Sequence, residues 1–240
     1  MFERKVAIIT GASKGIGACL LSGFREKGYG VVANSRSMKG SVAAGDPEIL
    51  VVKGDIALPD TAERIVVEAI ERFGRIDTLV NNAGLFIAKP FAEFSEADFA
   101  NVTAVNVAGF FHLTQRVASR MLQVGSGHIV NITSSLVAEQ PVASLPAALT
   151  ALTKGGLIAA TRALAIEYAG RGIRVNAVSP AATKTPMHSP EMYEFLAGLQ
   201  PVGRMGEPQE IVDAVLYLEK AGFVTGEILH VDGGAHAGRW

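Results

Sequence analysis

The chain has 240 residues, of which 49% are hydrophobic, so it is long enough to bury the core of one large domain. Its net charge is −1 and its 22 lysines and arginines are spread along the chain, which excludes the basic surface that nucleic acids or anionic membranes require. A single cysteine, Cys19, in an expected helix, a short N-terminal apolar run and no stretch of about 18 apolar residues favour a protein of the reducing cytoplasm.

Seven short apolar runs along the chain predict buried parallel strands. They occupy residues 5–10, 29–35, 48–55, 76–84, 127–134, 173–180 and 227–234. Helical patterns separate most of these runs, and strand–helix alternation predicts right-handed crossovers and a parallel sheet with helices on both faces. The sequence therefore predicts an α/β fold, in which residues 1–240 form a single doubly wound sheet of about seven strands.

The segment "TGASKGIG" follows the first predicted strand and opens the first helix. Its glycines, Gly11, Gly15 and Gly17, leave room for a pyrophosphate to approach the backbone. The helix N-terminus adds free N–H groups and partial positive charge. The placement between strand and helix indicates a dinucleotide site of the Rossmann type.

The end of the second strand predicts which dinucleotide fits. An acidic residue there would bind a ribose hydroxyl and repel a ribose phosphate, but the chain has Asn34, Ser35 and Arg36. Arg36 can pair with a 2′-phosphate, and Lys14 in the glycine turn can approach the same group. The sequence therefore favours NADP(H) over NAD(H), although Arg36 as a solvated loop charge is the alternative.

Four later segments carry specific expectations. Residues 35–47, rich in Gly and Ser, predict a loop or a single turn. Residues 59–74 predict an amphipathic helix capped by Asp60, and Ser95 with Asp98 predicts a capping box at the start of another helix. Residues 180–209 are irregular and proline-rich, so residues 183–206 are predicted to form an apolar substrate flap over a pocket.

Several further motifs make the chain similar to the short-chain dehydrogenase/reductase family over nearly its whole length. They are "TGASKGIG", Asp55, "NNAG" at 81–84, Asn106 in "VNVAGFF", "VNITSS" at 130–135, Lys154, "RVNAVSP" and the terminal "VDGG". The resemblance implies reversible hydride transfer between nicotinamide and a small-molecule carbonyl or alcohol, in a homotetramer or homodimer. No metal ligand is expected.

The resemblance also implies the site residues. The cofactor-binding set is Gly11, Ser13, Lys14, Gly15, Ile16, Gly17, Asn34, Ser35, Arg36, Asp55, Ile56, Asn82, Ala83, Gly84, Lys154, Pro180 and Thr183. The catalytic set is Asn106, Ser135, Thr150 and Lys154, with Ser134 and Ser144 as further candidates for contact with the substrate oxygen.

One family feature is missing from its expected position. The family has a tyrosine four residues before the lysine, on the same helix face, where the ammonium lowers the phenol pKa from about 10. Here that residue is Thr150, and no tyrosine occurs between Ser135 and Lys154. A threonine hydroxyl is a far weaker acid with a shorter reach, so Thr150 is no simple substitute.

Other proton donors are open at this point. Tyr193 and His188 in the predicted flap are candidates, as is a water held by Lys154, Asn106 or Ser135. The sequence therefore supports an NADP(H)-dependent oxidoreductase with a nonstandard proton donor. The alternatives are a non-catalytic NADP(H)-binding sensor or partner subunit, or a lyase- or isomerase-like chemistry on the same fold.

Two details of the backbone complete the expectations. Gly155 and Gly156 are expected to allow close packing of their helix against a neighbour. Ala181 stands where the family usually has glycine, which would be unfavourable if that residue needed a positive φ.

Overall fold

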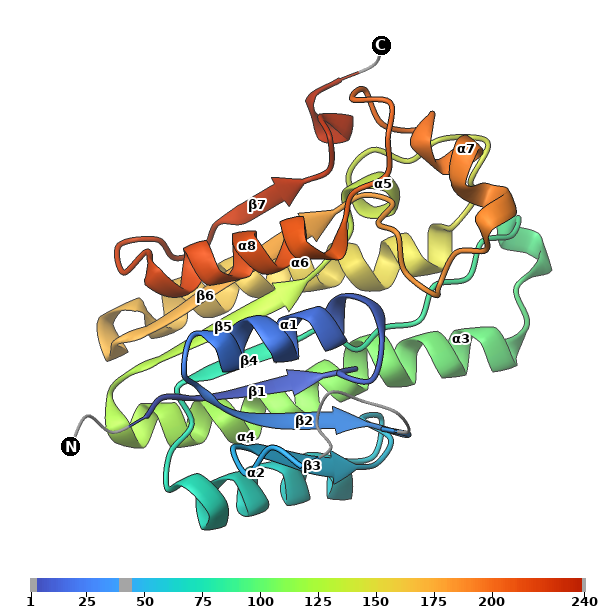
Figure 1. Cartoon of the computed structure of the whole chain (residues 1–240). Coiled ribbons are helices and arrows are strands. Elements are labelled where there is room, and N and C mark those ends of the chain that lie inside the picture. The colour runs from blue at the N-terminus through green and yellow to red at the C-terminus, as the bar shows by residue number, and fades with distance from the viewer. Residues whose placement is uncertain (1–3, 39–44, 239–240) are drawn as a thin grey trace.

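The computed structural model describes residues 4–38 and 45–238 (Figure 1). In this part of the chain seven parallel strands form one sheet, as the sequence predicts, and their order is β3-β2-β1-β4-β5-β6-β7. The strands are β1 (Val6–Thr10), β2 (Gly30–Ser35), β3 (Ile49–Lys53), β4 (Thr78–Asn81), β5 (Gly127–Ile132), β6 (Ile173–Pro180) and β7 (Ile228–Val231).

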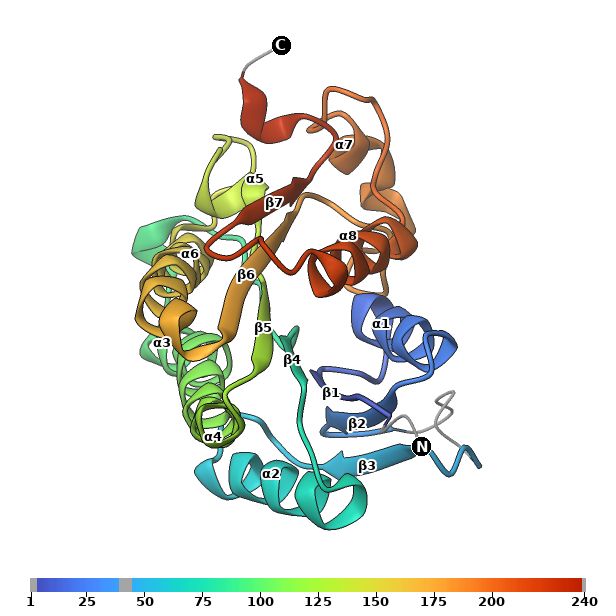
Figure 2. The same cartoon turned by 90° about the vertical axis from the view of Figure 1, so that its left-hand side faces the viewer.

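Helices cover both faces of this sheet (Figure 2). One face packs against α1 (Gly15–Glu26) and α8 (Pro208–Lys220), and the other against α2 (Pro59–Phe73), α4 (Gly109–Val124) and α6 (Ala148–Tyr168). Successive residues of β1 alternate between the two cores, as a strand buried on both faces requires. The shorter helices are α3 (Glu96–Thr103), α5 (Ser135–Ala138) and α7 (Tyr193–Ala197).

The strand order reverses beside β1, which pairs with β2 on one side and β4 on the other. In an open parallel sheet the crevice at such a reversal, outside the carboxyl ends of the strands, is where ligands bind. The glycine turn follows β1 directly, so the fold places the predicted dinucleotide site at this crevice.

At the N-terminus of α3 the structure confirms the predicted cap, and at the N-terminus of α2 it corrects the predicted one. The capping box at α3 is present: the Asp98 N–H donates to Ser95 Oγ (3.1 Å), and the Ser95 N–H donates to Asp98 Oδ2 (2.9 Å). The prediction for Asp60 is wrong, because α2 begins at Pro59 with Leu58 at its N-cap. Asp60 instead lies in the first turn, where its charge complements the helix dipole.

The helix α6 differs from its expectation in two ways. A Cβ built on Gly155 or Gly156 would meet no atom within 4 Å, so the predicted close packing of these glycines is wrong within the described chain. By length and composition Ala148–Arg171 is also apolar enough to cross a membrane. A search for about 18 consecutive apolar residues does not detect this segment, because charged residues interrupt it. In this structure the segment packs on the sheet through Ile158 and Ala165, which explains its apolar composition.

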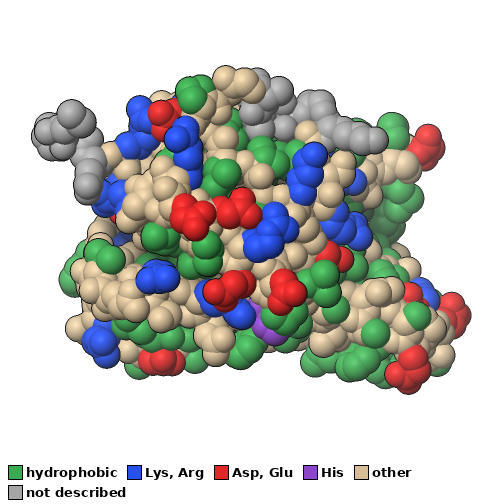
Figure 3. Space-filling model, turned by 90° about the horizontal axis from the view of Figure 1, so that it is seen from below, with side chains coloured by type: hydrophobic (Ala, Val, Ile, Leu, Met, Phe, Trp, Pro, Cys, Tyr) green, Lys and Arg blue, Asp and Glu red, His purple; other side chains and the backbone are tan. Residues whose placement is uncertain are grey.

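The loop predicted at residues 35–47 lies partly outside the described residues, because the structure does not describe residues 39–44. On the molecular face shown in Figure 3, acidic and basic side chains are interspersed. This mixture agrees with the near-zero net charge of −1.

Candidate functional site

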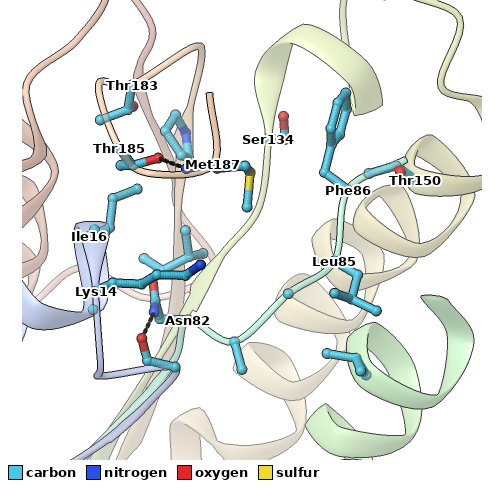
Figure 4. A pocket seen from close by; sticks show the side chains of 18 of the residues that line it. Lys14, Ile16, Asn82, Leu85, Phe86, Ser134, Thr150, Thr183, Thr185 and Met187 are labelled. Carbon is cyan, nitrogen blue, oxygen red and sulfur yellow. Dashed lines mark hydrogen bonds between the residues drawn. The ribbon is translucent and has the colours of Figure 1, made fainter. Parts of the chain in front are cut away.

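A cavity of about 460 Å³ lies at the crevice. Its walls come from residues that follow β1, β2, β3, β4, β5 and β6, so six strand ends converge on one space. All predicted cofactor-binding residues, from Gly11 to Thr183, line it, and so does Thr150. Figure 4 shows Lys14 and Ile16 on one wall, with Leu85, Phe86 and Thr150 on the opposite wall.

The three glycine positions of the turn have little room for a side chain. Gly11 and Gly15 have φ values of 66° and 55°, in the left-handed region that favours glycine. A Cβ on Gly17 would stand 2.2 Å from the Gly11 carbonyl oxygen. No side chain caps the N-terminus of α1, so its first N–H groups can bind a ligand. This cradle fits the pyrophosphate of a dinucleotide.

Thr10 is a site residue that sequence reasoning missed. Its Oγ1 accepts hydrogen bonds from the N–H groups of Asn82 (3.0 Å) and Ala83 (2.9 Å). The Asn82 amide in turn donates to the Thr10 carbonyl (2.9 Å). These bonds fix the glycine turn against the segment that follows β4, and only the pairing of β1 with β4 brings the two together.

The far end of the cavity is polar and basic. The Asn34 amide donates to the Val52 carbonyl (3.0 Å), so this buried side chain links β2 to β3. Ser35 Oγ donates to Ser13 Oγ (2.9 Å), which ties the end of β2 to the glycine turn. Arg36 and Lys14 line the same end. A phosphate at this point would meet two cations.

Lys154 lies at the inner wall of the cavity. Its Nζ donates to the Ile132 carbonyl at the end of β5 (2.7 Å), and burial lowers the pKa of Lys154 to about 8. A Cβ on Gly84 would stand 3.1 Å from Nζ, so the absence of a side chain there leaves space in front of the ammonium.

Thr150 lies one helical turn before Lys154 on α6. Its Oγ1 donates to the Ile87 carbonyl and accepts from the Ile87 N–H, both at 3.3 Å. The hydroxyl is therefore engaged with the backbone of the segment after β4. This double contact, which we call the Thr150–Ile87 latch, joins residues 63 positions apart in sequence.

All four tyrosines of the chain lie in its described part, and none lines the cavity. The Tyr29 hydroxyl donates to Glu219 (2.9 Å), and Tyr193 packs against a small apolar cluster that contains Leu196 and Met205. The flap contributes His188 to the cavity instead, and burial lowers the pKa of that imidazole.

Comparisons with known proteins give the family of this arrangement. The chain matches the family model described as enoyl-(acyl carrier protein) reductase over residues 11–236. It is also 37% identical to the subunit BbsD of (2S)-[(R)-hydroxy(phenyl)methyl]succinyl-CoA dehydrogenase from Thauera aromatica, across 97% of this chain and 96% of that protein. The chain belongs to the short-chain dehydrogenase/reductase family.

Solved structures of similar proteins contain nicotinamide cofactors. ElxO with NADP bound superimposes with a TM-score of 0.90 at 27% identity, across 98% of this chain and 100% of that one. The 3-ketoacyl-(acyl-carrier-protein) reductase from Brucella melitensis complexed with NADH has a TM-score of 0.89 at 31% identity, with the same coverage. The protein is therefore an oxidoreductase of this family whose structural neighbours bind NADP or NADH.

In this short-chain dehydrogenase/reductase, two predicted catalytic residues do not line the cavity. Ser135 is fully buried at the start of α5, whereas its neighbour Ser134, the N-cap residue of that helix, lines the wall. The structure thus corrects Ser135 to its neighbour in the same motif. The candidate Ser144 does not line the cavity either.

Asn106 lies behind the cavity wall, in a π-helical turn (Ala104–Ala108) between α3 and α4. Its Oδ1 accepts from the Leu85 N–H (2.8 Å), and its Nδ2 donates to the Leu85 carbonyl and Thr153 Oγ1 (both 3.0 Å). These bonds use both N–H groups of the amide and one of the two acceptor positions of Oδ1. In this structure Asn106 therefore positions the segment after β4. It is not among the cavity-lining residues, and its Oδ1 lies 3.5 Å from where a Cβ on Gly84 would stand.

The flap and its neighbours supply apolar wall residues. No described non-glycine residue has a positive φ, so Ala181 fits its position without strain. Parts of the predicted flap, among them Thr185, Met187 and Leu196, line the cavity. Sequence reasoning missed other wall residues: Leu85, Phe86, Ala88 and Leu145, which lie on irregular segments without periodicity, and Val137, which lies on the four-residue helix α5.

Proposed function

We propose that this protein is an NADP(H)-dependent oxidoreductase that transfers a hydride between nicotinamide and a carbonyl or alcohol, with a proton donor other than Thr150. The observation that carries this function is the single cavity that connects the glycine turn, Arg36 and Lys154 with the apolar flap. The related dehydrogenase and reductase support the same class of reaction.

The residues of the site fit the dinucleotide along its length. The side-chain-free turn at Gly11 and Gly17 would hold the pyrophosphate, and Lys14 and Arg36 would hold the 2′-phosphate. No carboxylate at the end of β2 opposes that phosphate. When bound, the nicotinamide supplies or accepts the hydride. Lys154 and Ser134 would stand on the wall where the reacting oxygen must lie.

The substrate end of the cavity favours a moderately hydrophobic ligand. Its wall is formed largely by the apolar side chains of Leu85, Phe86, Leu145, Met187, Met192 and Leu196. A homodimer or homotetramer and a cytoplasmic location remain predictions. Mobility of the flap at residues 183–206 is also a prediction.

A specific observation favours a second candidate function, that of a non-catalytic NADP(H)-binding protein. No tyrosine lines the described cavity, and the Thr150 hydroxyl is engaged in the Thr150–Ile87 latch. A protein with this arrangement would bind the cofactor without the usual acid and would act as a sensor or as a partner subunit.

The test compares binding with turnover on the purified protein. NADPH and NADH are titrated first, and then bound NADPH is mixed with a panel of hydrophobic aldehydes and ketones in single-turnover experiments, with Thr150→Tyr in parallel. We expect tighter binding of NADPH than of NADH and oxidation of NADPH by the unmodified protein. Tight binding with oxidation only by Thr150→Tyr would reject the oxidoreductase and support the binding protein.

A further inference from the structure

Few side chains at this cavity can exchange a proton. The titratable residues that line it are Lys14, Arg36, Asp55, Lys154 and His188. The first three lie at the glycine turn and after β2 and β3, at the dinucleotide end. Lys154 on α6 and His188 on the flap are the other two, so the proton for a substrate oxygen must come from one of these two groups or from water.

Lys154 has donors available. An ammonium carries three N–H groups, and the Ile132 carbonyl is its only hydrogen-bond acceptor among the described residues. Nζ faces the space beside Gly84, where a Cβ would stand 3.1 Å away. Two N–H groups are therefore left for a ligand, and the anchor at Ile132 holds the ammonium in one place.

The threonine opens the path to this ammonium. Residues 150 and 154 share one face of α6, separated by about 6 Å along the axis. A phenol at position 150 would extend into the cavity in front of Lys154. Thr150 is short and is turned toward Ile87 by the latch. A substrate oxygen can therefore come closer to Lys154 than a tyrosine would permit.

We propose that Lys154 is the proton donor and acceptor of this active site, an inference that rests on the proposed oxidoreductase function. In carbonyl reduction, the carbonyl carbon gains the hydride of the bound cofactor and the C=O π bond breaks toward oxygen. That oxygen takes a proton from Nζ, directly or through one water. The amine is left neutral, and it regains its proton from solvent. Alcohol oxidation reverses each transfer.

The environment of Lys154 suits this role. Burial lowers its pKa to about 8, so both protonation states are populated near neutral pH, as proton transfer requires. The charged groups that share the cavity, including Asp55 and His188, are not among the causes of the shift. On elements packed against α6, Asp98 pairs with Lys89.

The residue after α5, Glu139, likewise pairs with His230 (2.6 Å). Glu96, the other carboxylate of α3, is exposed, and burial is the cause of the pKa shift of Lys154. Among the described residues, no carboxylate on the packed elements therefore holds Lys154 in its charged form. The protonation state that each direction of the reaction needs gives the sign of its pH dependence. Reduction needs the ammonium, so its rate is full below about pH 8 and falls tenfold per unit above it. Oxidation needs the neutral amine, so its rate rises toward pH 8 and then levels.

The experiment replaces the amine by one of lower basicity. In a Cys19→Ser background, Lys154→Cys leaves one cysteine, which 2-bromoethylamine converts into a lysine analogue of the same length with a sulfur in the chain. Single-turnover reduction and oxidation are measured from pH 6 to 10, alongside NADPH affinity. The ¹³Cε resonances of labelled lysine report the titration of Lys154 directly, and Lys154→Arg identifies its signal.

We expect Lys154→Arg to retain NADPH binding and to lose about a hundredfold or more in turnover. The alkylated protein should regain turnover, with both pH profiles moved to lower pH. In the unmodified protein the kinetic midpoint should match the ¹³Cε titration. Lys220→Arg, at the exposed end of α8, is the matched control and should change nothing. A role confined to cofactor binding would restore turnover without moving the profiles.

Three results would overturn the inference. The alkylated protein keeps the original profiles, Lys154→Arg keeps turnover, or His188→Gln abolishes the pH dependence while NADPH still binds. In each case turnover by the unmodified protein leaves the proposed function standing. Absence of turnover in the unmodified protein, with NADPH bound, would instead reject the oxidoreductase function and this inference with it.

Discussion

The Thr150–Ile87 latch makes a prediction that separates the structural role of Thr150 from a role as an acid. Thr150→Val keeps the shape of the side chain and removes the hydroxyl, so both 3.3 Å contacts with the Ile87 backbone are lost. Hydrogen bonds of this length are weak and contribute about 0.5 kcal/mol each to stability. The half-buried N–H of Ile87 also loses its acceptor. We expect the free energy of unfolding to fall by about 1–2 kcal/mol.

The assay is urea unfolding at one fixed protein concentration. The m value, which is the slope of the free energy of unfolding against urea concentration, is compared between variants. Thr103→Val on α3 is the matched control, because that half-buried helical threonine makes no side-chain hydrogen bond to a described residue. For a chain of this size, the expected change lowers the melting temperature by about 2–8 °C. Turnover of Thr150→Val should stay within a few-fold of the unmodified protein. Equal stability of the two variants would refute the latch, and loss of turnover with intact folding would make Thr150 part of the chemistry.

Three other predictions concern the cradle, the phosphate end and the opposite edge of the sheet. Gly17→Ala should weaken NADPH binding at least tenfold, because its Cβ would clash with the Gly11 carbonyl; NADPH affinity equal to that of the unmodified protein would contradict the cradle. The control Gly156→Ala, in open space on a helix, should instead stabilise the protein by up to about 1 kcal/mol in urea unfolding. Arg36→Ala should weaken NADPH binding by roughly ten- to a hundredfold and leave NADH binding unchanged in fluorescence titrations, and a parallel loss of both would argue against a 2′-phosphate contact. Burial lowers the pKa of His128. Burial acts to raise the pKa of Glu219, but the hydrogen bonds from His128 and Tyr29 and the nearby positive charges together outweigh it and lower that pKa. The unfolded chain therefore binds more protons, and stability should fall progressively below pH 6.5; identical urea midpoints at pH 7.5 and 5.5 would contradict this.

Local patterns in the sequence were sufficient for the sheet and for the dinucleotide residues. The apolar runs and their alternation with helices predict all seven strands of the sheet. The glycine spacing from Gly11 to Gly17 and the residues after β2 directly identify parts of one cavity. These signals are local because parallel strands bring their carboxyl ends to one edge, whatever the details of side-chain packing.

The catalytic end was not predictable in the same way. Ser134 and Ser135 are equivalent in the sequence motif, and only the turn from β5 into α5 decides which of them faces the cavity. Asn106 matches a family motif, yet its amide hydrogen-bonds to Leu85 and Thr153 and is not among the cavity-lining residues. The direction of a side chain at such a junction depends on the packing of separate elements.

By itself, the sequence determined the doubly wound sheet, the glycine cradle and the presence of a threonine in place of a tyrosine four residues before Lys154. Only the tertiary structure decided what that threonine does, because its partner Ile87 is 63 residues away. The pKa of Lys154 near 8 is likewise a tertiary property, since it arises from the burial of the ammonium by surrounding elements. Residue type fixes which chemistry is available, and packing fixes which groups are aimed at the substrate and how strongly they hold their protons.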